Sequence, residues 1–441
     1  MTDNTMFGGP VRAVYGASGD VVGLGVGGDT VLIPGVPGNG LVIIGDSLSA
    51  QGYVTTAAFP KTQNHIYWPH ALSMLKWPLR LVNMAAVSGR TIQQVLAGFD
   101  SEVAAYQPAW VWCLVGTNNC GLATAESDVA DLQSIAAKCR GIGAKLLLCT
   151  IPPRDSAGMS SQIQKDMLVL NRGIRAIGRN GDAYIADIHA ALHDPTTSNG
   201  AAASLMLHDG VHTSAYGAQL SGAEVARSLS GAIIPCRDAV QGNWDCRQVH
   251  AESRQLITNP KCQGTAGTTP GSGGAGTVAT GWNLNRNTGS NLISTGSKIS
   301  ETSPRREWQR ITFSGTCSGT EVSKFKINTG IGALLAAVPA GSRLRARATI
   351  RSSGISTNFK CIRLVGELQN GSSVQIVGAG SLEDSTFTQT VMPTDEFVLE
   401  TPEFLYDSGA VFTQTSIYTE FTTGAASGYI DVTDVELVIV D

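Results

Sequence analysis

The stretch Leu41-Val-Ile-Ile-Gly-Asp-Ser-Leu-Ser, residues 41–49, joins an uninterrupted apolar run to a polar turn. A short run of this kind is typical of a strand that is buried on both faces of a sheet. Ser47 follows the run at once, so its hydroxyl would lie at the rim of the sheet, near free backbone N–H groups. Because Gly-Asp-Ser is also an ordinary turn sequence, this serine indicates chemistry only if partners for it lie elsewhere in the chain.

Residues 40–232 continue this pattern by alternating strand-like and helix-like segments. Further apolar strands are predicted at 79–82, 110–115, 145–151 and 183–186. Helices are predicted at 67–77, 91–106, 167–177 and 215–229, and another is predicted from one apolar face over 129–139, which Gly141 would end. Such alternation predicts a parallel sheet covered on both faces, with its site beyond the carboxyl ends of the strands.

Three other regions complete the chain. Residues 1–39 are short apolar runs broken by glycine, which predict small strands that pack on another domain or chain. Residues 233–280 lose periodicity, and the glycine-rich stretch 264–276 predicts a flexible linker, with a packed loop as the alternative. Residues 281–441 alternate polar and apolar residues between turn-forming clusters, which predicts an antiparallel β-sandwich, most simply a jelly roll.

The segment His208-Asp-Gly-Val-His-Thr-Ser, directly before the last predicted helix, offers a base for the serine. Asp209 and His212 are three residues apart, so one tight turn can aim both side chains the same way. The carboxylate would orient the imidazole through one ring nitrogen, while the other nitrogen removes the proton of Ser47. The alternative is that Asp209 or Thr213 caps the helix and that His212 is a surface residue.

Two further turns supply donors for the negative charge that develops on a substrate oxygen. Gly89 lies in a turn after one predicted strand, and its missing side chain lets the backbone N–H approach a ligand. Asn118 lies in a turn after the next strand, and its side-chain amide is a neutral donor. Ser47, Gly89, Asn118 and His212 therefore come from successive strand ends of one predicted sheet.

In that order, these four residues resemble the sequence blocks that name the SGNH hydrolases, also called the GDSL esterase/lipase family. The resemblance covers residues 40–232 and implies a flavodoxin-like three-layer α/β/α fold. It also implies a catalytic triad of Ser47, His212 and Asp209, with an oxyanion hole built from the N–H groups of Ser47 and Gly89 and the amide of Asn118.

The second and third blocks depart from the family pattern. Ala85 and Ala86 stand where the family often has glycine. The spacing from Asn83 to Gly89 is one residue longer than in the family pattern. Ser88 or another neighbour is therefore an alternative to Gly89 as the N–H donor. Asn119 stands where many members carry aspartate. This departure does not affect the assignment of Asn118 to the oxyanion hole.

The appended sandwich gives an expectation about the substrate. It resembles carbohydrate-binding modules found beside polysaccharide esterases, and residues 40–232 contain no long amphipathic lid of the kind that suits long-chain lipids. We therefore expect removal of O-acetyl groups from an acetylated polysaccharide. The alternatives are a lipase, thioesterase or acyltransferase acting on small acyl esters, and a non-catalytic glycan-binding adhesin.

The glycine-broken N-terminal segment gives an expectation about the setting. Together with the C-terminal β region and the missing signal-peptide pattern, it resembles phage tail-spike deacetylases of bacterial surface glycans, which are often trimeric. A homotrimer in a virion, or another extracellular setting, is the resulting hypothesis, and a cytoplasmic location is the alternative.

Composition argues against several other classes. A net charge of -4 and a pI near 6.0 give no reason to expect nucleic acid or an anionic membrane as partner. No apolar run approaches the roughly 18–20 residues that span a bilayer. No cofactor is expected. His189 and His193 have helical i, i+4 spacing, but no acidic residue stands between them, so we expect no metal site there.

The cysteines and tryptophans allow only a few expectations about disulfides and sugar contacts. The nine cysteines lack metal-type spacing. One disulfide is conceivable among Cys236, Cys246 and Cys262 and another between Cys317 and Cys361, with free thiols as the alternative. Among the tryptophans of residues 40–232, Trp68 is the best candidate for a sugar platform, whereas Trp77, Trp110 and Trp112 are expected in the core.

Overall fold

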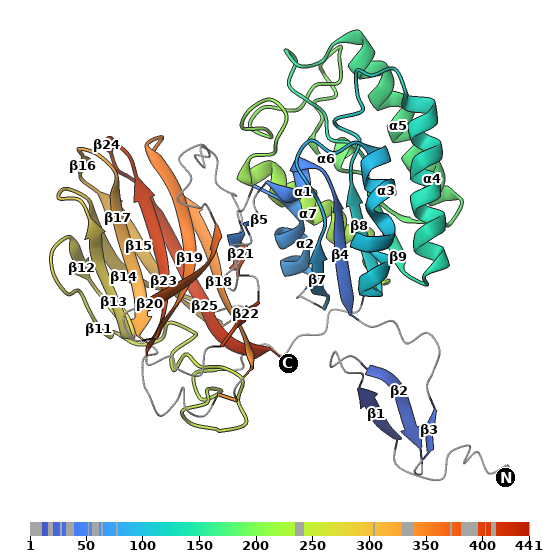
Figure 1. The fold of residues 1–441 in the computed structure, drawn as a ribbon. Coiled ribbons are helices and arrows are strands. Elements are labelled where there is room, and N and C mark those ends of the chain that lie inside the picture. The colour runs from blue at the N-terminus through green and yellow to red at the C-terminus, as the bar shows by residue number, and fades with distance from the viewer. Residues whose placement is uncertain are drawn as a thin grey trace.

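The computed structural model of the chain is shown in Figure 1. It describes residues 11–15, 21–26, 29–31, 39–51, 53–54, 61–62, 65–75, 78–233, 242–302, 305–328, 338–339, 341–370, 373–380, 396–401, 403–406 and 412–440. Two bodies of secondary structure account for most of these residues, one mixed α/β and one built from β-sheets.

A five-stranded parallel sheet forms the centre of the α/β body. Its strands are β4 (Gly40–Gly45), β7 (Arg80–Met84), β8 (Trp110–Leu114), β9 (Lys145–Cys149) and β10 (Tyr184–Ala186). The spatial order is β10-β9-β8-β4-β7, which is the flavodoxin-like order. The winding direction reverses between β4 and β8, and a site is expected beyond the carboxyl ends of the strands at such a point. Ser47 follows β4 there.

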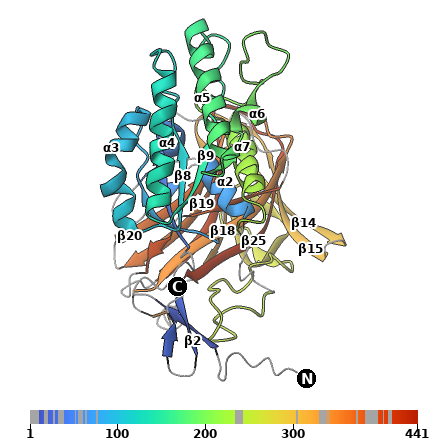
Figure 2. The ribbon, with the colours of Figure 1, turned by 90° about the vertical axis from the view of Figure 1, so that its right-hand side faces the viewer.

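Helices cover both faces of this sheet (Figure 1), and Figure 2 looks onto one of the two helical layers. One face carries α3 (Ile92–Glu102), α4 (Ala125–Gly141) and α5 (Ser161–Arg179), and the other carries α2 (Tyr67–Met74) and α7 (Ala215–Ser228). Val42 and Ile44 of β4 pack against the first layer, while Leu41 and Ile43 pack against the second. Burial on both sides is the reason that the run Leu41–Ile44 has no polar residue.

The predicted α/β elements are confirmed, with small shifts at their ends. Gly141 is the last residue of α4, as expected, and Gly143, two residues further on, has a left-handed φ of +75°. The short helices α1 (Ser47–Ala50) and α6 (Ile188–Leu192) and the 3-10 turn Ala104–Tyr106 were not predicted separately.

Two sheets that share one apolar core form the second body. One contains β11 (Ala266–Thr268), β13 (Val278–Thr288), β17 (Glu321–Asn328), β23 (Phe412–Phe421), β19 (Phe359–Asn370) and β20 (Ser373–Gly380). The other contains β12 (Gly274–Gly276), β14 (Ile293–Thr302), β15 (Arg305–Ser314), β25 (Tyr429–Val440), β18 (Arg343–Ser353) and β21 (Phe397–Glu400), with β22 (Phe404–Leu405) beside β18. A small third sheet pairs β16 (Thr316–Cys317) with β24 (Gly424–Ala425). The antiparallel sheets expected in this region are confirmed, and the jelly-roll topology stays a prediction.

The glycine-rich stretch 264–276 differs from the flexible linker that its composition suggests. Its strands β11 and β12 lie parallel to β13 and β14 and extend the two sheets. Glycine is needed for this packing, because a Cβ at Gly267 would lie 2.2 Å from the carbonyl oxygen of Ala279. The alternative expectation, a glycine-rich segment packed on its neighbours, describes this stretch better.

Two short strands that follow α1 in the chain belong to the larger sheet of the second body. β5 (Tyr53–Val54) pairs antiparallel with β6 (Lys61–Thr62), and β6 pairs parallel with β20. Nearby, helix α2 packs against β21, and Arg80 of β7 forms an ion pair of 3.5 Å with Glu403. The two bodies are therefore joined by shared backbone pairing as well as by side chains.

The N-terminal segment forms a separate antiparallel sheet. Its strands are β1 (Val11–Tyr15), β2 (Val21–Val26) and β3 (Asp29–Val31), as the glycine-broken apolar runs predict. Within the part of the chain that the structure describes, no helix is long and apolar enough to cross a membrane.

Two minor expectations need correction. Trp68 is 1% exposed and its Nε1 donates to the carbonyl oxygen of Ser49, so it is a core residue and no sugar platform. Trp110 and Trp112 are buried as expected, and Trp77 lies outside the described residues. The eight described cysteines are buried free thiols, which excludes the Cys317–Cys361 and Cys246–Cys262 disulfides, and Cys236 lies outside the described residues.

Candidate active site

Ser47 is held in place by the turn that ends β4. A side chain at Gly45 would collide with the carbonyl oxygen of Leu114 on β8, because a Cβ there would lie 2.1 Å from it, and the φ of Gly45 is +147°. The neighbouring backbone N–H of Asp46 donates to that same oxygen at 3.3 Å. Ser47 thus begins helix α1 at a point where two strands of the sheet are in close contact.

The buried side chain of Asp46 holds this turn in place. Its Oδ1 accepts the backbone N–H of Leu48 at 3.0 Å and caps α1. Its carboxyl is fully buried, and burial raises its pKa to about 7, against the opposing effect of hydrogen bonds from the N–H groups of Leu48, Thr117 and Gly116. Asp46 therefore ties the serine turn to the turn after β8, which contains Asn118.

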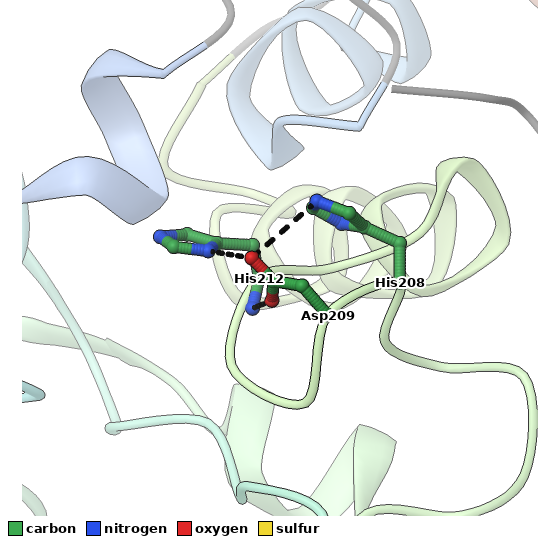
Figure 3. A group of neighbouring side chains, drawn as sticks. All are labelled: His208, Asp209 and His212. Atoms are coloured by element: carbon green, nitrogen blue, oxygen red, sulfur yellow. Dashed lines mark hydrogen bonds and ion pairs between the residues drawn. The ribbon is translucent and has the colours of Figure 1, made fainter. Parts of the chain in front are cut away.

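The turn before α7 organises the predicted acid and base. Asp209 Oδ1 accepts the backbone N–H groups of Val211 at 3.0 Å and His212 at 2.8 Å. This leaves Asp209 Oδ2 to accept from His212 Nδ1 at 2.7 Å (Figure 3). Ser214 caps α7 by accepting from the N–H of Gly217, so the alternative in which Asp209 or Thr213 caps this helix is wrong.

The serine and the histidine meet across the rim of the sheet. Ser47 Oγ lies 2.9 Å from His212 Nε2, and the Ser47 residue is 8% exposed. Since His212 Nδ1 donates its proton to Asp209, Nε2 carries the lone pair that accepts from the serine hydroxyl. The three side chains therefore form a continuous relay from hydroxyl to carboxylate, which is the geometry of an activated nucleophile.

Asp209 is held in its ionised form. Burial alone would raise its pKa, but the hydrogen bonds from the His212 backbone and ring and from the Val211 backbone outweigh it and lower the pKa to about 2. The carboxylate therefore carries its charge at any pH near neutrality and can stabilise an imidazolium at His212.

The predicted donors are placed as follows. Within the described part of the chain, neither the Ser47 nor the Gly89 backbone N–H donates to another protein group. Gly89 has a left-handed φ of +82°, and a Cβ there would meet no atom within 4 Å, so this turn lies open. Asn118 Nδ2 donates one hydrogen to the carbonyl oxygen of Arg90 at 2.9 Å. Its second hydrogen is available for a substrate oxygen.

Asn119 has a structural role that differs from that of Asn118. Its Oδ1 accepts the backbone N–H of Ile92 at 3.0 Å, and its Nδ2 donates to Gln93 Oε1 at 3.1 Å. Asn119 is 1% exposed, so it anchors the N-terminus of α3 to the turn after β8. The amide provides an acceptor and a donor at once, which an ionised aspartate does not.

Other histidines surround the site. His65 is buried, and its ring centroid lies 5.7 Å from that of His208, which in turn lies 5.9 Å from that of His212. Burial, reinforced by the neighbouring His208 and His212, lowers the pKa of His65 to about 3. His65 is therefore neutral near physiological pH, and its carbonyl oxygen accepts from Thr213 Oγ1 at 2.6 Å.

The helical histidine pair His189 and His193 stacks with ring centroids 5.4 Å apart. Burial, with a contribution from His193, lowers the pKa of His189 to about 4. Within the described residues, the one group of at least three metal-ligating side chains is instead His208, Asp209 and His212.

Sequence reasoning missed three contributors to the site. Asp46 looked like a turn residue because its burial depends on packing against the turn after β8. His208 was quoted only as part of its motif, although its Nε2 lies 3.6 Å from Asp209 Oδ2. Asp155 gave no signal at all, yet its N–H donates to the carbonyl oxygen of Gly210 at 2.9 Å and steadies the same turn.

Comparison with known proteins finds a family match for part of the chain. Residues 43–220 match the model of the GDSL-like Lipase/Acylhydrolase family. The chain is similar to the structure of a GDSL-like lipase from Bacteroides thetaiotaomicron VPI-5482, at 18% identity over 44% of this chain and 89% of that one, with a TM-score of 0.36. It is also similar to a catalytic mutant of an acetylxylan esterase from Geobacillus stearothermophilus, at 19% identity over 47% of this chain and 99% of that one, with a TM-score of 0.37. No curated protein matches the chain.

Proposed function

We propose that the chain is a serine esterase with Ser47 as nucleophile, His212 as general base and Asp209 as orienting acid. The match of residues 43–220 to the GDSL-like Lipase/Acylhydrolase family model supports this proposal. The observation that carries this proposal is the relay of two contacts, 2.9 Å from Ser47 Oγ to His212 Nε2 and 2.7 Å from His212 Nδ1 to Asp209 Oδ2. Ser47 comes from the turn after β4, whereas Asp209 and His212 share the turn before α7.

The mechanism follows from these positions. His212 Nε2 takes the proton of Ser47 as Oγ attacks the ester carbonyl, and Asp209 stabilises the imidazolium that forms. The N–H groups of Ser47 and Gly89 and the second hydrogen of Asn118 would hold the oxyanion of the tetrahedral intermediate. His212 then protonates the departing alcohol, and it activates the water that hydrolyses the acyl-enzyme.

The proposed substrate is an O-acetylated polysaccharide. Support comes from the β-sandwich, whose larger sheet includes β5 and β6. These two strands are the next elements in the chain after α1, the helix that begins at Ser47. A glycan held by residues 281–441 would therefore be tethered close to the chain segment that carries Ser47. Acetate release from a panel of acetylated polysaccharides, with deacetylated samples of the same polysaccharides as controls, tests this substrate class.

Two other functions make different predictions. A lipase, thioesterase or acyltransferase would prefer longer acyl chains or another acceptor, whereas a deacetylase prefers acetate among p-nitrophenyl esters of increasing chain length. An adhesin would turn over none of them. The relay at Ser47 favours an active enzyme over an adhesin.

Ser47→Ala separates chemistry from binding. The variant keeps the turn and the cap of α1, since Asp46 caps the helix, but it lacks the nucleophile. We expect loss of acetate release with glycan binding retained. Wild-type-like turnover by Ser47→Ala would contradict the mechanism, and loss of glycan binding as well would contradict a separate binding role for the sandwich.

A trimeric tail-spike setting is a further proposal, supported by the N-terminal strands β1–β3 beside two larger bodies. Size-exclusion chromatography with light scattering on the full chain tests it. Three chains per particle are expected, and a monomer at micromolar concentration would contradict a spike.

A further inference from the structure

A second nitrogen ligand faces the triad carboxylate. His208 Nε2 lies 3.6 Å from Asp209 Oδ2, while His212 Nδ1 lies 2.7 Å from the same oxygen (Figure 3). Ligand atoms of the three residues all lie within 4.8 Å of one another. One carboxylate oxygen is thus flanked by two imidazoles that approach it from different sides.

The tautomer of His208 suits a metal ligand. His208 Nδ1 lies 3.1 Å from the carbonyl oxygen of Thr213, and a carbonyl can only accept, so Nδ1 carries the ring proton. In the neutral ring, Nε2 then carries the lone pair, and it is this nitrogen that faces Asp209. The hydrogen bond to a backbone carbonyl through the opposite ring nitrogen is the usual support of a metal-bound histidine.

The spacing and the chemistry fit a borderline transition-metal dication. Zinc binds imidazole nitrogen and carboxylate oxygen at about 2.0–2.2 Å, so ligand atoms around it lie about 3–3.5 Å apart. The present separations of 3.6 Å and 2.7 Å bracket that range, and small side-chain rotations would bring them into it. Two imidazoles and one carboxylate favour zinc over calcium or magnesium, which prefer all-oxygen sites.

We propose that His208, Asp209 and His212 form an inhibitory Zn²⁺ site in which the ion holds the triad in an inactive state. A neutral imidazole has one N–H and one lone pair. When His212 Nδ1 gives its lone pair to zinc, the ring proton resides on Nε2, which can then no longer accept the proton of Ser47. Zinc also takes the oxygen of Asp209 that would otherwise stabilise the imidazolium. Metal binding goes beyond the proposed esterase function, and its inhibitory effect rests on that function.

The binding experiment is independent of turnover. ZnCl₂ is titrated into full-length Ser47→Ala by isothermal titration calorimetry and compared with Ser47→Ala carrying His208→Asn in addition. Asparagine places an amide donor where His208 Nδ1 lies, so the bond to the Thr213 carbonyl is kept while the Nε2 ligand is removed. His193→Asn is the matched control, because His193 Nδ1 lies 3.1 Å from the Ala190 carbonyl oxygen in the same way.

The expected result is one zinc site per chain in Ser47→Ala, at least about tenfold weaker with His208→Asn and unchanged with His193→Asn. Ser47→Ala with His212→Gln removes the other imidazole, and it should weaken zinc binding likewise, which keeps the test valid if His208→Asn fails to fold. No zinc binding, or binding that His208→Asn and His212→Gln leave unchanged, would overturn the proposal.

Inhibition is measured on the wild type. Zinc should lower kcat with little change in KM, because it traps the base and leaves the substrate contacts alone, and EDTA should restore the rate. Relative to its own metal-free rate, His208→Asn should need at least about tenfold more zinc for the same loss. Absence of any esterase activity would reject the proposed function and leave the calorimetric result standing, whereas an active enzyme that zinc does not inhibit would reject the inhibitory site.

Discussion

Ser47 and His212 are separated by 165 residues in the chain, yet Ser47 Oγ and His212 Nε2 lie 2.9 Å apart. One residue follows the first strand of the parallel sheet and the other precedes its last helix. The contact therefore depends on the whole α/β body being folded, because no local segment holds both groups. Turnover should therefore depend on the packing that holds the turn after β4 beside the turn before α7.

Asp209→Asn should disable the base without disturbing the turn. The asparagine Oδ1 can still accept from the N–H groups of Val211 and His212, but its NH₂ would face His212 Nδ1 and force the ring proton onto Nε2. We expect kcat to fall by about 10⁴-fold with KM nearly unchanged, the size seen when a triad aspartate is neutralised in another serine hydrolase. Asp100→Asn, whose side chain is 79% exposed on α3, is the control. A loss below tenfold would contradict the orienting role of Asp209.

Asn118→Ala and Asn119→Ala should separate transition-state binding from stability. Removing the free amide hydrogen of Asn118 should lower kcat by about 100- to 1000-fold, with the urea midpoint little changed. Asn119→Ala leaves the buried N–H of Ile92 without its acceptor and should lower the free energy of unfolding by about 1–3 kcal/mol. Steady-state kinetics and urea unfolding on both variants check this, and interchanged effects would contradict the assignment of Asn118 to the oxyanion hole.

Asp46 should make stability depend on pH. Its pKa is raised from 3.8 to about 7 in the folded protein, so the native state binds this proton more tightly than the unfolded chain. The stability that this provides is complete below about pH 4 and is lost as the pH rises towards 7.

Asp46→Asn removes this titration. The free energy of unfolding of the wild type minus that of the variant should fall by about 1–4 kcal/mol between pH 4 and pH 7.5. Glu400 and Glu436, whose pKa values burial also raises to about 7, are present in both proteins and cancel in the difference. Urea unfolding at four pH values measures it, and a difference that is constant with pH would contradict the buried, protonated state of Asp46.

Gly267→Ala tests the packing of the glycine-rich stretch. Its Cβ would lie 2.2 Å from the carbonyl oxygen of Ala279, so we expect a loss of about 1–3 kcal/mol in the free energy of unfolding. Gly141→Ala is the control, because a Cβ at Gly141 in α4 meets no atom within 4 Å, and alanine there should stabilise by about 0.5–1 kcal/mol. If Gly267→Ala left the free energy of unfolding unchanged, this would contradict close packing of residues 264–276 and favour a flexible linker.

The α/β body could be predicted because its signals are local. The run Leu41–Ile44 is apolar throughout since both faces of β4 are covered, and Asp209 and His212 share one turn. The burial of Asp46 and the role of Asn119 could not be predicted, because both depend on contacts between turns far apart in the chain. The strands in 264–276 were missed for another reason, since glycine-rich composition is the same in a flexible segment and in one that packs closely against backbone.

The pairing of β6 with β20 limits how the protein can be divided. Lys61 and Thr62 lie beside Gly378 and Ala379, so a chain cut before the sandwich would leave β6 without its neighbour, and a sandwich produced alone would lack the strands that complete one edge. Such an edge is open to pairing with other chains. The hydrolase and the β region should therefore be inherited, transferred or transplanted together, and a swap of the sandwich between related enzymes would have to carry residues 53–62 with it.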